Sequence, residues 1–120
     1  MTLFHATQFH DTYGTAIANV VTALEHGIRT IDSSVGGLGG CPYSPGATGN
    51  VATEDVLYAL NGSQYEISGG VDLEQVVDIG WWISDALGRQ CESRVGKALR
   101  ARKQREARQS DDTRGTVHAA

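Results

Sequence analysis

The segment TAIANVVTALEHGIRTIDS, residues 15–33, sets the fold class because it changes from a helical to an extended pattern. Its first part predicts an amphipathic helix over Thr15–His26, since apolar residues recur three and four positions apart and Gly27 follows. The apolar positions of this helix are Ile17, Val20, Val21 and Leu24. The residues after Gly27 predict a strand over about Ile28–Ser33.

The flanking segments extend this pattern on both sides. Phe4–Phe9 is short and tolerates an extended backbone, so we expect a strand there. Two strands joined by a short helix favour a right-handed parallel βαβ unit, which is typical of α/β folds. Further along, ATEDVLYALNG predicts a second helix that begins with Thr53 as its N-cap and ends at Asn61-Gly62.

The C-terminal half predicts another amphipathic helix, over about Leu73–Leu87, closed by Gly88. The residues sharing its apolar face are Leu73, Val76, Val77, Gly80, Trp81 and Ser84. Beyond Arg94 the chain is basic and polar, so we expect a helical end that frays into a disordered tail over residues 101–120. Because two parallel strands are marginal by themselves, residues 1–100 look like part of a larger domain.

The composition excludes several classes of function. The chain has 120 residues, of which 40% are hydrophobic and 20% charged, and its net charge is -4. This charge gives no reason to expect nucleic acid or an anionic membrane as a partner, and the apolar runs are too short for a membrane span. Two cysteines cannot form a disulfide framework, which favours a reducing compartment.

Three side chains follow the predicted strands, where parallel α/β folds bind ligands. His10 follows the first strand, and Cys41 lies in a glycine-rich loop after the second, ahead of Asn50. His10 is a candidate metal ligand or a histidine hydrogen-bonded within a loop. Cys41 is a candidate reactive thiol or a small buried hydrophobe, and Asn50 a cation ligand or an N-cap.

Three other residues have simpler interpretations. Glu54 and Asp55 lie in the first turn of a predicted helix, where the helix dipole suffices to explain two acids. Cys91 follows a helix in a polar segment, so we interpret it as incidental.

The stretch FHDTYGTAIANVVTALEHGIRTIDSSVGGLGGCPYSPGATGNVATEDVLYALNG, residues 9–62, resembles the C-terminal part of the 3-hydroxy-3-methylglutaryl-CoA lyases. More broadly, it is similar to the metallolyase TIM barrels of pyruvate carboxyltransferase type, and GGLGGCPY with GATGNVATED forms the specific signature. The resemblance extends more loosely to about Arg102. It implies an α/β fold, a partial TIM (β/α)8 barrel formed by the last two βα units plus C-terminal helices.

The resemblance also implies an activity and a site. Such enzymes cleave hydroxymethylglutaryl-CoA to acetyl-CoA and acetoacetate with a divalent metal, Mg²⁺ or Mn²⁺, in leucine degradation and ketone-body formation. His10 matches the second histidine of the family's H-x-H metal motif, Asn50 its asparagine ligand and Cys41 its catalytic cysteine. Gln8 replaces the expected first histidine, and a glutamine cannot act as a base at neutral pH.

The resemblance covers only the last strands of the barrel, so we expect little activity from this chain alone. One alternative is a working lyase whose missing units come from another chain. Another is a non-catalytic fragment that docks on a full-length lyase subunit through its exposed sheet edge. The expected ligand is the acyl-CoA substrate, and the resemblance implies a mitochondrial location in a eukaryote and a cytoplasmic one otherwise.

Overall fold

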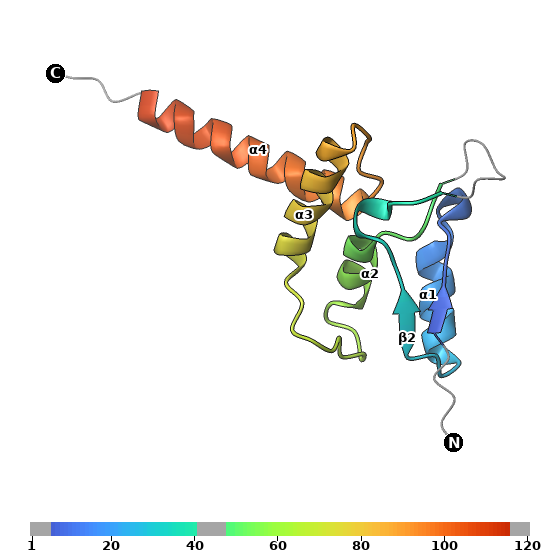
Figure 1. Cartoon of the computed structure of the whole chain (residues 1–120). Coiled ribbons are helices and arrows are strands. Elements are labelled where there is room, and N and C mark those ends of the chain that lie inside the picture. The colour runs from blue at the N-terminus through green and yellow to red at the C-terminus, as the bar shows by residue number, and fades with distance from the viewer. Residues whose placement is uncertain (1–5, 41–47, 116–120) are drawn as a thin grey trace.

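The computed structural model describes residues 6–40 and 48–115, and it begins with the expected βαβ unit (Figure 1). Strand β1 (Ala6–Gln8) leads through the 3-10 turn η1 (Thr12–Gly14) into α1 (Ala16–Glu25), and β2 (Thr30–Asp32) follows. The two strands pair in parallel, with Thr7 opposite Ile31. The parallel unit is therefore confirmed. Strand β2 is shorter than the sequence suggests, and β1 ends one residue before the expected Phe9.

Four further elements follow this unit along the chain. A second 3-10 turn, η2 (Val35–Gly37), follows β2, and α2 (Thr53–Leu60), α3 (Leu73–Ala86) and α4 (Arg94–Gly115) complete the order. Helix α2 lies between the βαβ unit and α3 (Figure 1). Helix α3 contacts η2, α2 and α4, so it holds the C-terminal half together.

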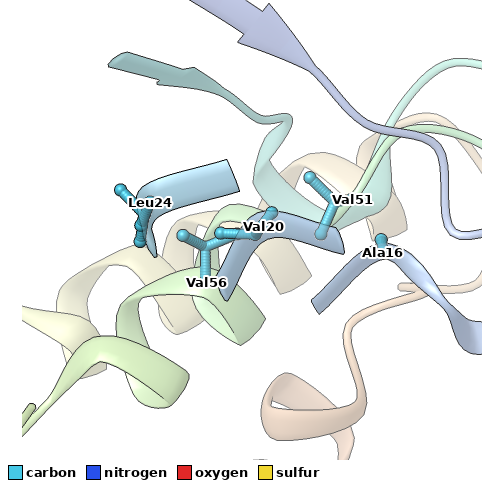
Figure 2. Close-up of a cluster of buried hydrophobic side chains, with 5 residues drawn as sticks. All are labelled: Ala16, Val20, Leu24, Val51 and Val56. Carbon is cyan, nitrogen blue, oxygen red and sulfur yellow. The ribbon is translucent and has the colours of Figure 1, made fainter. Parts of the chain in front are cut away.

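The hydrophobic core lies between α1, α2 and the segment before α2 (Figure 2). Its buried residues are Ala16, Val20, Leu24, Val51 and Val56. Val20 and Leu24 belong to the apolar stripe predicted for α1, and they are buried because α2 brings Val56 against that stripe. The 3.6-residue period of the sequence therefore identified the face of α1 that forms the core.

Helix α3 is buried along one face and also contacts α4. Val77, Gly80 and Ser84 are buried, as the predicted apolar face requires, and the Asp72 side chain caps the helix by accepting from Gln75 N. A polar contact also joins α3 to α4: the Nζ of Lys103 in α4 lies 2.9 Å from the Oδ1 of Asp78 in α3.

The expected disordered tail is wrong for residues 101–115, which continue α4 to Gly115. Residues 97–114 contain neither glycine nor proline, and Arg102 pairs with Glu106 one turn later at 3.6 Å. The loss of apolar periodicity therefore signalled exposure rather than loss of the helix. The C-terminal end of this polar helix projects away from the remaining elements (Figure 1). No helix among the described residues has the length and hydropathy to cross a membrane.

Leu24→Ala tests the core beneath β1 and β2. Leu24 is 5% exposed, so its truncation leaves a cavity and is expected to lower the free energy of unfolding by about 2–4 kcal/mol. Urea titration measures this loss, and Leu87→Ala is the matched control because Leu87 is 61% exposed. Equal losses for the two variants would contradict the placement of the core.

Candidate functional site

Gln8, His10 and Asn50 come together at the carboxyl ends of the two parallel strands. Gln8 ends β1, and His10 lies two residues later, so both side chains leave the same face of an extended chain. His10 and Asn50 stand opposite each other in an isolated antiparallel bridge. The structure thus assembles three of the four residues that the sequence singled out, from segments far apart along the chain.

The segment before α2 places Asn50 by binding to both strand ends. Asp11 N donates to Gly49 O, and Val51 N donates to Phe9 O, each at 3.0 Å. These two bonds flank the bridge, which makes His10 and Asn50 a non-hydrogen-bonded pair with closely spaced side chains. On the β2 side, Ser34 N donates to Val51 O at 3.0 Å.

The amide of Asn50 is held from both ends. Its Oδ1 accepts from Gln8 Nε2 at 2.6 Å, and its Nδ2 donates to Leu38 O at 3.0 Å. Gly39 makes room for this amide: a Cβ at Gly39 would lie 2.7 Å from Asn50 Nδ2, and the residue has φ +90°. Asn50 is therefore not a helix cap, because α2 has Ala52 at its N-cap with no side-chain bond.

Two further predictions have different outcomes. Thr53 is the first residue of α2 rather than its N-cap, and its hydroxyl instead bonds Ser33 Oγ at 2.8 Å. Cys41 lies outside the described residues, so its proposed role stays a prediction.

Asp11, next to His10, has structural partners for both carboxylate oxygens. Oδ1 accepts from Ala16 N at 3.1 Å, at the start of α1. Oδ2 lies 3.3 Å from an Arg94 guanidinium nitrogen, at the start of α4. Asp11 therefore links the beginnings of two helices beside the candidate site.

Glu54 is a fully buried carboxylate that sequence reasoning assigned only to the helix dipole. Both of its oxygens accept from Gly36 N, at 2.9 and 3.0 Å, so it holds the turn that follows β2. Gly80 of α3 makes room for it, because a Cβ there would collide with Glu54 Oε1. Burial raises the pKa of Glu54, the backbone N–H groups of Glu54 and Gly36 oppose this, and the nearby Asp55 adds to it.

Asp55 performs the equivalent task for α4. Its carboxylate accepts from Ser93 Oγ at 2.7 Å, Val95 N at 2.9 Å and Arg94 N at 3.2 Å. These donors include backbone N–H groups of the first turn of α4, which would otherwise lack partners within the helix. The sequence shows that Glu54 and Asp55 are adjacent, but only the folded chain shows which distant residues they bind.

Cys91 is part of the packed interior rather than incidental. It is fully buried, and a Cβ added at Gly36 or at Gly96 would lie 3.7 or 3.4 Å from its Sγ. Burial raises the pKa of the Cys91 thiol, which keeps it in the unreactive protonated form.

The donor set at the strand ends suits part of a divalent cation site. An imidazole and amide oxygens are accepted ligands, but hard cations take six or more donors, usually with carboxylates. Within residues 6–40 and 48–115, no group of three or more His, Cys, Asp or Glu side chains is placed to hold a metal ion. The described chain therefore offers some ligands of such a site and not a complete shell.

The family model described as HMGL-like matches residues 2–83, which include the whole strand-end cluster. The chain belongs to the HMGL-like family. A hydroxymethylglutaryl-CoA lyase of Pseudomonas mevalonii is 63% identical over 101 residues, covering 84% of this chain and 33% of that relative. A mitochondrial hydroxymethylglutaryl-CoA lyase of Gallus gallus is 53% identical over 93 residues, covering 78% of this chain and 30% of that relative.

The solved structures of this family confirm the α/β fold class. The crystal structure of hydroxymethylglutaryl-CoA lyase from Pseudomonas aeruginosa matches with a TM-score of 0.73 and 58% identity. The match covers 81% of this chain and 32% of that one. The chain thus spans about a third of the length of the relatives that it matches, in their C-terminal part.

Glu54→Gln tests the buried carboxylate through the pH dependence of stability. A raised pKa in the folded chain means that the contribution of Glu54 to stability is fully present below the unfolded pKa, here 4.5, and is lost as pH rises through the folded pKa. Relative to the Gln variant, the wild-type free energy of unfolding should therefore fall with rising pH, by about 1.4 kcal/mol per unit of raised pKa.

Urea titrations from about pH 4 to about pH 8 measure this difference between the two proteins. The exposed Glu66→Gln is the control and should keep the wild-type pH dependence. Parallel curves for wild type and Glu54→Gln would show that Glu54 is not the group responsible.

Proposed function

We propose that this chain forms the C-terminal part of a hydroxymethylglutaryl-CoA lyase catalytic unit. It would supply the last two βα units of a TIM barrel and the helices that follow. The observation that carries the proposal is the convergence of Gln8, His10 and Asn50 at the carboxyl ends of two parallel strands, in a member of the HMGL-like family. Active sites of such barrels lie at this end.

The proposed reaction breaks one carbon–carbon bond of 3-hydroxy-3-methylglutaryl-CoA. A base takes the proton of the tertiary hydroxyl, and the electron pair of the O–H bond forms the ketone of acetoacetate. The carbon–carbon bond breaks, and its electron pair stays with the acetyl-CoA fragment, which leaves as an enolate. Cys41 would then supply the proton that converts this enolate into acetyl-CoA. The relatives' names support the CoA-linked substrate.

His10 and Asn50 would be this chain's ligands for a divalent cation, Mg²⁺ or Mn²⁺. The cation would polarise the substrate's hydroxyl and the carbonyl oxygen that it becomes. The bond from Asn50 Nδ2 to Leu38 O supports this assignment, because it turns Oδ1, the amide atom that could bind a cation, toward Gln8 at the strand end.

Gln8 weakens the site in two ways. Its Nε2 occupies Asn50 Oδ1, the oxygen proposed as a ligand. In addition, an amide has no titratable nitrogen near neutral pH, so Gln8 cannot accept the hydroxyl proton. We therefore propose that this chain is inactive by itself and that its site is completed by residues of the N-terminal part of the lyase fold.

Gln8→His is expected to strengthen divalent cation binding. An imidazole replaces an amide and removes the Nε2 donor from Asn50 Oδ1, so we expect about tenfold tighter Mn²⁺ binding. Electron paramagnetic resonance of free Mn²⁺ measures the affinity without any need for activity. Gln75→His is the matched control on the exposed side of α3, and equal affinities for the two variants would refute the proposed ligand cluster.

Lyase activity is expected only when the N-terminal part of the fold is present. We expect no acetoacetate from hydroxymethylglutaryl-CoA and Mg²⁺ with this chain alone. Release is expected after co-expression with the N-terminal part of the Pseudomonas mevalonii lyase. Cys41→Ala should lower the rate at least about 100-fold, as loss of a general acid does, whereas Cys91→Ser should keep activity in proportion to folded protein.

Acetoacetate is measured by a coupled enzymatic assay on the purified mixture. Turnover by this chain alone would contradict the proposed dependence on the N-terminal part. Full activity of Cys41→Ala in the mixture would remove Cys41 from the reaction.

A further inference from the structure

The turn between β1 and α1 has a strained backbone close to His10. Tyr13, in the middle of η1, has φ 51° and ψ 26°, in the left-handed region that residues with a side chain rarely adopt. Its side chain is 99% exposed, so packing of the ring does not hold the turn. Backbone strain of this kind persists only where surrounding contacts fix the chain. Other residues must therefore hold η1 in place.

Arg94, the first residue of α4, contacts this turn at both ends. Its Nη2 lies 3.3 Å from Oδ2 of Asp11, the residue that precedes η1. The same nitrogen lies over Gly14, which ends η1: a Cβ at Gly14 would lie 2.5 Å from Arg94 Nη2, and this glycine has φ +77°. The guanidinium therefore occupies the space that the missing side chain of Gly14 leaves open, and it spans the turn.

Arg94 is itself fixed to the segment that carries Asn50. Arg94 N donates to Asp55 Oδ2 at 3.2 Å, and Asp55 is a buried residue in the first turn of α2, shortly after Asn50. The contacts and the bridge at the strand ends close a ring, whose members are Asn50, Asp55, Arg94, Asp11 and His10. All of them except His10 line one pocket of about 110 Å³. The ring therefore ties the beginning of α4 to the candidate site.

We propose that Arg94 is a positioning residue for His10, which it keeps opposite Asn50 by holding η1 and Asp11. The inference rests on the proposed function for the role of His10 as a cation ligand. Residues that orient a metal ligand without touching the metal typically change metal affinity about 10- to 100-fold when they are replaced. Helix α4 is thereby part of the site, although it lies outside residues 2–83 that the family model matches.

This positioning role differs from a contribution to global stability. The Arg94 side chain is 61% exposed, and exposed ion pairs add little to stability because solvent and salt screen them. Loss of the guanidinium should therefore leave the chain folded while it frees η1. A purely structural role would instead affect the whole chain, with the site no more disturbed than the core.

Arg94→Met tests the inference through amide hydrogen exchange, which NMR measures residue by residue. Methionine keeps an unbranched apolar side chain and removes the guanidinium. The amides of Asp11 and Val51 donate the two bonds that flank the bridge of His10 with Asn50, and they should exchange at least about tenfold faster. Exchange of Val77, buried in α3, should change less than about twofold.

Arg102→Met is the matched control. Arg102 also lies in α4, is 47% exposed and pairs with a carboxylate, since its Nη2 lies 3.4 Å from Glu74 Oε1. This variant should leave the exchange of Asp11 and Val51 at the wild-type rate. Unchanged exchange at these two amides in Arg94→Met, or equal acceleration by Arg102→Met, overturns the inference.

Tyr13→Asn supplies a rescue that a purely structural role would not give. Asparagine adopts the left-handed backbone more readily than tyrosine, so the turn should no longer need the guanidinium. Adding Tyr13→Asn to Arg94→Met should therefore return the exchange of Asp11 and Val51 to within about threefold of the wild-type rate. Exchange that stays fast in the double variant shows that Arg94 does not act by holding η1, and the inference then fails.

Mn²⁺ binding separates this inference from the proposed function. Electron paramagnetic resonance of free Mn²⁺ should show about tenfold weaker binding when Arg94→Met is added to Gln8→His, and no change when Arg102→Met is added. Faster exchange at Asp11 and Val51 without Mn²⁺ binding by any variant keeps the role of Arg94 in placing His10 and refutes the cation site. Mn²⁺ binding that Arg94→Met leaves unchanged keeps the cation site and overturns the inference.

Discussion

The buried carboxylate of Glu54 is the contact on which the arrangement of this chain depends. It binds Gly36 N with both oxygens and thereby fixes the turn between β2 and the glycine-rich loop. Gly80 must be small for Glu54 to fit, so the same contact also sets how closely α3 approaches. Removing the acceptor would leave a buried N–H unpaired, which typically costs about 1–3 kcal/mol.

Asp55 extends this constraint to the C-terminal half. Neighbouring residues of a helix point about 100° apart, so Glu54 and Asp55 reach different partners from one turn of α2. Asp55 binds Ser93 and the first turn of α4. Arg94, in that same turn, forms an ion pair with Asp11, the residue after His10. Two consecutive acids therefore connect the candidate site, the turn after β2 and the long C-terminal helix.

Backbone hydrogen bonds between two distant segments hold the candidate site together. The backbone bonds of Gly49 and Val51 place Asn50 beside His10, and Leu38 O orients its amide. Gln8 fits this framework as a hydrogen-bond donor, which stabilises the site without a cation.

The sequence by itself determined the local elements and the family. Periodicity identified the buried faces of α1 and α3, and element order predicted the parallel strands. The glycine-rich signature predicted the lyase family, and the positions of His10 and Asn50 after the strands predicted that they would lie at the same end of the sheet. Only the tertiary structure decided the burial of Glu54, Asp55 and Cys91 and the bond from Gln8 to Asn50. The local sequence pattern indicates whether a segment prefers a helical or an extended backbone. The hydrogen-bond partners of a polar side chain, in contrast, are residues that folding brings near it.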